Sequence, residues 1–69
     1  MIEDYIMDVL DEYGPLYVDD LILGAGEELD CTRAEVEDAI IRLEELGKAR
    51  GYVEDATGLP RIERTEGSE

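Results

Sequence analysis

The apolar positions of residues 2–13 repeat with the spacing of an α-helix. They fall at i, i+3, i+4, i+7, i+8 and i+11, and they are Ile2, Tyr5, Ile6, Val9, Leu10 and Tyr13. Acidic side chains occupy most of the other positions, so this stretch predicts an amphipathic helix with one buried face. Gly14-Pro15 should end it, because glycine suits the position after a helix and proline cannot continue one.

A stub strand and a second helix are predicted over residues 16–30. Residues 16–18 are apolar and partly β-branched, and they could pair with a later hairpin. Asp19 and Asp20 favour a helix start, because the helix dipole stabilises acidic residues in the first turn. The apolar positions that follow are spaced i, i+4 and i+8, and they are Leu21, Ala25 and Leu29. Gly24 and Gly26 leave two interpretations open: the helix ends near Gly24, or the glycines let it pack closely against a neighbour.

A third helix is predicted from Thr32 to Gly47. Thr32 is a good N-cap, and Glu35 three residues later completes a capping box. Gly47 suits the position just after the helix. The expected buried stripe consists of Val36, Ala39, Ile40, Leu43 and Leu46.

Two strands follow, over about residues 49–54 and 61–65, with turn-forming residues at 55–60 between them. We expect Val53, Ile62 and either Tyr52 or Leu59 to face the core. The four tyrosines are expected in the core or at its edge, and they are Tyr5, Tyr13, Tyr17 and Tyr52. The chain is therefore predicted to be one domain over residues 1–66, with residues 67–69 as a frayed tail.

The order helix, stub strand, helix, helix, hairpin resembles the winged helix-turn-helix family over residues 2–65. The most family-like part is residues 32–52, where Leu43-Glu44-Glu45-Leu46-Gly47 is similar to the Leu-x-x-x-Gly element that leads into the wing of MarR-type and related archaeal regulators. The resemblance implies a mainly α fold with a small β-hairpin (α+β), in a three-helix winged helix-turn-helix arrangement.

The resemblance also implies a DNA-binding site, because the third helix of DNA-binding members enters the major groove and the wing contacts the backbone or the minor groove. Carried over by position, the candidates on the third helix are Thr32, Arg33, Glu37 and Ile41. The candidates for phosphate contacts at the helix end and the wing are Lys48, Arg50, Arg61 and Arg64. Arg33 alone at the helix start could form a bidentate contact with guanine.

The acidic side chains of the third helix depart from this family pattern. Glu35, Glu37 and Asp38 would face phosphates as like charges, and the six bases are dispersed among acids. The bases also allow a different interpretation, in which they form surface ion pairs. Arg42 would then pair with Asp38 on the helix, and the hairpin would pair Arg50 with Glu63 and Arg61 with Glu54.

The chain of 69 residues has a net charge of −14, and the charge is unevenly divided. Residues 1–32 contain ten acids and no base, whereas residues 33–69 contain ten acids and all six bases. The excess acidic side chains repel one another, which disfavours the compact state in dilute buffer. This repulsion is screened at molar salt, where the Debye length is about 3 Å. The composition resembles that of cytoplasmic proteins from salt-accumulating, haloarchaeal cells. A DNA mimic and an ordinary acidic interaction module are the alternatives.

Several classes of chemistry lack their residues. The chain has no histidine, and its lone Cys31 is expected to be a buried, inert thiol. Its glycines match no phosphate-binding or dinucleotide fingerprint, and its paired acids do not follow a calcium-loop spacing. We therefore expect no enzyme activity, no cofactor, no metal and no small-molecule substrate. No apolar run reaches the roughly 20 residues of a membrane span, so a soluble, cytoplasmic protein is expected.

The resemblance implies a small DNA-binding winged-helix regulator of transcription type with double-stranded DNA as its partner, and the composition indicates a halophilic organism. The alternative is a winged helix used for protein–protein contact, for instance as an adaptor in a replication or transcription assembly. A homodimer or a protein partner would fit exposed apolar residues outside the core stripes, for which Ile22, Leu23 and Ile41 are candidates. Packing of these residues against the first helix is equally consistent with the pattern.

Overall fold

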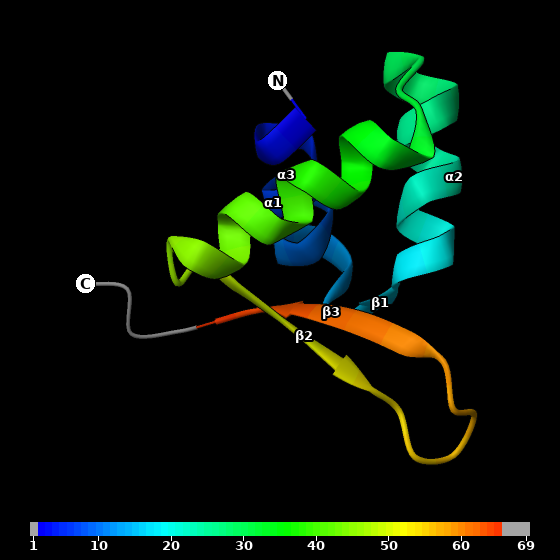
Figure 1. The fold of residues 1–69 in the computed structure, drawn as a ribbon, viewed down its shortest axis with the longest axis vertical. Helices are drawn as coiled ribbons and strands as arrows, with labels where there is room; N and C mark the ends of the chain where they lie inside the picture. The colour runs from blue at the N-terminus through cyan, green and yellow to red at the C-terminus, as the bar shows by residue number, and fades with distance from the viewer. Residues whose placement is uncertain (1, 66–69) are drawn as a thin grey trace.

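Three helices pack together on one side of a small antiparallel sheet in the computed structural model, which describes residues 2–65 (Figure 1). In chain order the elements are α1 (Ile2–Tyr13), β1 (Leu16–Tyr17), α2 (Val18–Leu29), α3 (Arg33–Glu45), β2 (Ala49–Val53) and β3 (Pro60–Arg64). The predicted α+β class and the order of elements are confirmed for this part of the chain. Residue 66 and the predicted tail, residues 67–69, lie outside the described residues.

The sheet has the strand order β1-β3-β2, so the stub strand lies beside the last strand of the chain. Both neighbouring pairs are antiparallel: Leu16 is opposite Ile62 in one, and Gly51 is opposite Ile62 in the other. The predicted pairing of the stub strand with the hairpin is therefore confirmed. Because Ile62 is fully buried, the alternation of a strand places Leu16, Gly51 and Val53 on the face that the helices cover.

One apolar core joins the three helices to the sheet. Its buried residues are Ile6, Leu10, Leu21, Ala25, Val36, Ala39, Ile40, Leu43, Ala49 and Ile62. Most of them belong to the stripes predicted from helical spacing, because that spacing places side chains on one helix face. Cys31 is half-buried and packs against this core, so it is less enclosed than expected.

The ends of the helices follow the predicted capping. Thr32 Oγ1 accepts from the Glu35 N–H at 3.2 Å, and the Thr32 N–H donates to Glu35 Oε1 at 2.9 Å, which completes the capping box. Gly14 and Gly47 have φ values of +82° and +75°, the left-handed conformation that lets a chain leave a helix without strain.

Gly24 lies inside α2, which continues without a break to Leu29. A Cβ on Gly24 would lie 2.7 Å from the hydroxyl oxygen of Tyr5 on α1. Of the two interpretations left open by the sequence, the close approach of α2 to a neighbour is therefore the one that the structure supports at Gly24.

Three residues predicted to be buried lie largely in solvent, and each is at the end of its element. Tyr13 is the last residue of α1 and is 68% exposed; Leu46 follows α3 as its C-cap and is 66% exposed. Val53 is on the predicted face but is 63% exposed, because the hairpin extends past the helices toward its turn (Figure 1). Neither Tyr52 nor Leu59 is buried in the core, and Leu29 at the end of α2 is also exposed. Periodicity predicts which side of a helix or strand faces the core. It does not predict where the neighbouring elements stop covering that side.

Candidate binding face between α3 and the hairpin

A groove of about 460 Å³ separates the outer side of α3 from the inner face of the β2–β3 hairpin. Its surface is mostly apolar, and the core residues Ile40 and Ile62 are among those that line it. Ile41 of α3 and Val53 of β2, 51% and 63% exposed, contribute further apolar surface. Exposed apolar side chains in one hollow distinguish this face from scattered surface leucines such as Leu23.

Helical spacing places the groove-side residues of α3. Glu37, Ile41 and Glu44 follow each other at i, i+4 and i+7, and all three line the groove. The rise along the helix is 1.5 Å per residue, so the backbone positions of Glu37 and Glu44 are about 10.5 Å apart along the axis, with Ile41 between them. The apolar floor therefore has an acidic rim on its α3 side.

At Gly51 a hydrogen bond connects the hairpin to α3 beside the groove. The Gly51 N–H donates to Glu44 Oε2 at 2.9 Å, and a Cβ on Gly51 would lie 2.7 Å from the same oxygen. A side chain at residue 51 would thus force the Glu44 carboxylate to shift. Glycine in the middle of a strand is a signal of such close approach, and it could have pointed to this contact in the sequence.

All five arginines pair with carboxylates, and the pairs are spread over different elements. Arg33 lies 3.4 Å from Glu37 and 3.5 Å from Asp19 of α2. The other four pairs are Arg42–Glu3, Arg50–Glu63, Arg61–Glu54 and Arg64–Asp11. The two cross-hairpin pairs are as predicted. The expected Arg42–Asp38 pair is wrong, because the Arg42 guanidinium reaches Glu3 on the adjacent α1 instead.

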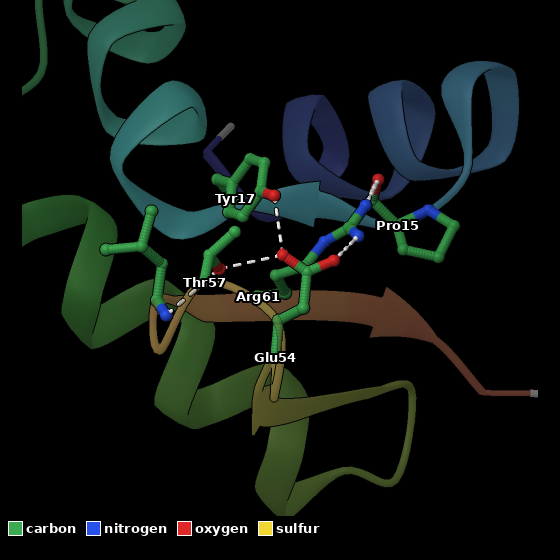
Figure 2. Close-up of polar contacts among 6 residues, drawn as sticks. Pro15, Tyr17, Glu54, Thr57 and Arg61 are labelled. Carbon is green, nitrogen blue, oxygen red and sulfur yellow. Dashed lines mark hydrogen bonds and ion pairs between the residues drawn. The ribbon is translucent and has the colours of Figure 1, made fainter.

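Glu54 collects three donors at the end of the hairpin, as Figure 2 shows. Tyr17 Oη donates to Glu54 Oε1 at 2.6 Å, Thr57 Oγ1 donates to the same oxygen at 2.8 Å, and Arg61 donates to Oε2 at 2.8 Å. A second Arg61 N–H donates to the Pro15 carbonyl at 2.7 Å. We call these five residues the Glu54 cluster; it ties the hairpin to β1 and to the segment before it.

Charge and hydrogen bonding in the Glu54 cluster reinforce each other. The Tyr17 hydroxyl, with the Thr57 and Arg61 donors, holds the pKa of Glu54 below its ordinary value, and the Glu54 carboxylate raises the pKa of Tyr17. The Arg61 guanidinium carbon also lies 4.7 Å from the centroid of the Tyr17 ring, within cation–π range. Arg61 is thus engaged by three neighbours on the face of the sheet opposite Ile62.

The predicted site residues separate into three groups. Glu37 and Ile41 of α3 line the groove, as does Arg61 of β3, whereas Thr32 and Arg33 lie at the start of α3, where Thr32 serves as the cap. The predicted phosphate contacts do not form one patch: Arg50 and Arg64 pair with Glu63 and Asp11, and Arg61 belongs to the Glu54 cluster. Lys48 is exposed and has no ion pair within residues 2–65.

Glu44, Gly51, Val53 and Glu54 were not among the predicted site residues. Glu44 follows Glu37 by two helical turns, so its place on the groove side was readable from α3 spacing. The three-donor environment of Glu54 depends on a turn and on β1, and no local pattern indicates it.

The described residues offer no group of three or more histidine, cysteine, aspartate or glutamate side chains placed to hold a metal ion. A helix long and apolar enough to cross a bilayer is also not found over residues 2–65. Comparison of the chain with protein-family models, with curated proteins and with solved structures finds no match.

Proposed function

We propose that this chain is a protein-interaction module with a winged-helix layout, and that it binds a basic, partly apolar partner in the groove between α3 and the hairpin. The observation that carries the proposal is an apolar hollow with an acidic rim, built from Ile41, Val53, Glu37 and Glu44. The winged-helix layout is supported by the order of elements and by the hairpin that follows α3.

Apolar surface favours a protein partner over nucleic acid at this face. Covering it removes apolar area from water, which contributes about 25 cal/mol per Å². A phosphate backbone cannot supply that gain, and it would bring like charge toward Glu37 and Glu44. At 4 Å, two unit charges in water interact by about 1 kcal/mol. Basic side chains on a protein partner would turn the same carboxylates into attractive contacts.

A second copy of the chain fits the groove less well than a basic partner. Each copy has a net charge of −14, and each would present Glu37 and Glu44. Two such faces repel each other at low salt, and at molar salt the repulsion is merely screened. We therefore do not place the expected homodimer contact in this groove. The same charge supports a cytoplasmic, salt-accumulating setting for the protein.

The test is site-specific cross-linking followed by binding to the identified partner. A photo-reactive amino acid replaces Val53 in the groove or, as a matched control, Leu23 on α2, both about equally exposed. Proteins captured from Val53 and not from Leu23 are identified, purified and titrated against the wild type and Ile41→Asp. The proposal predicts direct binding that Ile41→Asp weakens while its circular dichroism is unchanged. Binding that does not respond to Ile41→Asp, or capture equal at both positions, refutes it.

DNA binding is the second candidate function. It is favoured by the confinement of all six bases to residues 33–64, by Lys48, which has no ion pair within residues 2–65, and by the exposed guanidinium of Arg50. Genomic fragments titrated in molar KCl should then bind the wild type and Arg42→Ala, and should bind Lys48→Ala/Arg50→Ala weakly. Arg42 is the control because it faces α1 through Glu3. An acidic DNA mimic would instead bind a DNA-binding protein in competition with duplex DNA.

A further inference from the structure

The free edge of β2 limits how a partner can use the groove. In the order β1-β3-β2, one edge of β2 pairs with no other strand of residues 2–65. Thr65 N–H donates to Lys48 O and Glu54 N–H to Leu59 O, so the even-numbered residues of β2 bond toward β3. The N–H of Gly51 therefore points to the free edge, where Glu44 Oε2 accepts it at 2.9 Å. A partner strand would first have to displace this carboxylate, whereas a helix satisfies its own backbone hydrogen bonds.

The spacing of the acidic rim also distinguishes a helix from a strand. Glu37 and Glu44 are two helical turns apart, about 10.5 Å. A partner helix matches this distance with basic side chains at i and i+7, which lie on one face. In an extended chain, at about 3.3 Å per residue, the same distance spans three residues, and side chains three apart point to opposite faces. Glu44 Oε1 takes part in no hydrogen bond with residues 2–65, so it can accept a partner's donor while Oε2 keeps Gly51.

The apolar part of the groove lies between the two carboxylates. Ile41 stands between Glu37 and Glu44 on α3, and Val53 contributes apolar surface from the hairpin. On a partner helix, positions i+3 and i+4 lie between i and i+7 on the same face. Large apolar residues there would meet Ile41 and Val53 while the basic residues meet the rim.

We propose that the occupant of the groove is an amphipathic helix that lies along α3, with lysine or arginine at i and i+7 and large apolar residues at i+3 and i+4. This inference rests on the proposed function, because it names the chemistry of the partner for the same groove. Helix-in-groove recognition needs an apolar face held by a few anchors, and the rim here fixes the register of those anchors.

The probe is a synthetic, labelled helical peptide of about 18 residues with lysine at i and i+7 and leucine at i+3 and i+4. Its control has the same composition, with the second lysine moved to i+9 on the opposite face. Anisotropy titrations against the whole chain in molar KCl should give a higher affinity for the matched peptide, by up to about fivefold, because one exposed ion pair contributes at most about 1 kcal/mol. Glu37→Lys should weaken the matched peptide about tenfold, and exchanging its first lysine for glutamate should restore binding to that variant. Glu27→Lys, an exposed change on α2, is the protein control and should have no effect.

Equal affinity of the two peptides overturns the inference, as does tighter binding of a proline-containing peptide that cannot form a helix. If neither peptide binds while a cross-linked partner binds the wild type and not Ile41→Asp, the helical mode is wrong and the proposed function stands. If the binding of no cross-linked partner depends on Ile41 either, the helical mode and the proposed function are both wrong.

Discussion

Replacing Gly24 should reveal how closely α2 approaches α1. A glycine inside a helix is less favourable than alanine by up to about 1 kcal/mol, so Gly24→Ala would ordinarily stabilise the protein. Here the new methyl group would lie 2.7 Å from the Tyr5 hydroxyl oxygen, well inside van der Waals contact. Tyr5→Phe removes that oxygen, and the nearest remaining side-chain atom, Tyr5 Cζ, is 3.9 Å away, an ordinary contact.

The effect of Gly24→Ala on the free energy of unfolding should therefore differ between the Tyr5→Phe and wild-type backgrounds. In the Tyr5→Phe background, Gly24→Ala should stabilise the chain by about 1 kcal/mol. In the wild-type background the Tyr5 ring must shift, and a side chain forced about 30° from its rotamer costs about 0.5–1.5 kcal/mol. This cost cancels or reverses the stabilisation by alanine. The difference between the two backgrounds, which is the coupling energy of residues 5 and 24, is therefore about 1 kcal/mol. For a domain of this size that corresponds to roughly 4–8 °C in Tm.

The assay is a double-mutant cycle. Thermal and urea unfolding of the wild type, the two single variants and the double variant are followed by circular dichroism in molar KCl. Burial raises the pKa of the Tyr5 hydroxyl, and the difference between the spectrophotometric titrations of the wild type and Tyr5→Phe isolates this group. If Gly24→Ala stabilises both backgrounds equally, Tyr5 does not contact Gly24, and α2 does not approach α1 as closely as described.

Three further predictions concern the core, the hairpin and the solvent. Leu43→Ala should destabilise the fold by about 2–5 kcal/mol, and Leu46→Ala by less than about 0.5 kcal/mol, measured by urea unfolding; equal losses would contradict the assigned burial. Because Tyr17 and its neighbours lower the pKa of Glu54 from 4.5, the carboxylate stabilises the fold above that pH and loses this effect as pH falls through the folded pKa. Glu54→Gln should thus lower Tm at pH 7 more than at pH 3, with Glu27→Gln on the exposed surface of α2 as the control variant. Below about 0.5 M salt the chain should expand or unfold, and circular dichroism unchanged across a salt series would refute the halophilic interpretation.

Helical periodicity and caps predicted most of the fold, because both depend on residues close in sequence. Thr32 and Glu35 form the predicted capping box, and the stripe of α1 contains the buried Ile6 and Leu10. The errors are at element ends, as for Leu46, where burial depends on whether another segment covers the side chain. The path of α2 through Gly24 depends on a neighbour, Tyr5, that no local pattern identifies.

The candidate site was less predictable, because a groove is a relation between segments. Glu37 and Ile41 were selected through the resemblance to DNA-binding winged helices, and they line the groove that we assign to a protein partner. Arg61 was selected as a phosphate contact, but its guanidinium holds Glu54 and the Pro15 carbonyl. An Arg61→Ala variant would therefore change the hairpin as well as the surface charge, and it is a poor test of DNA binding.

The uneven charge of the chain has an explanation within the fold. Glu3, Asp11 and Asp19 of the base-free N-terminal half pair with Arg42, Arg64 and Arg33 of the C-terminal half. Three of the six bases thus need no nucleic acid to account for their positions, since Arg33, Arg42 and Arg64 link α1 and α2 to α3 and β3.

These ion pairs differ in how readily they could be released. Pairs between exposed side chains contribute about 0–1 kcal/mol, so a phosphate could replace Asp11 as the partner of Arg64 at little cost. The Arg61 and Glu54 side chains are only 23% and 24% exposed, and Arg61 also holds Pro15. If duplex DNA binds, its contacts should therefore depend on Arg33, Lys48, Arg50 and Arg64 and leave the Glu54 cluster intact. A Tyr17 fluorescence or chemical-shift change on adding DNA would contradict that separation.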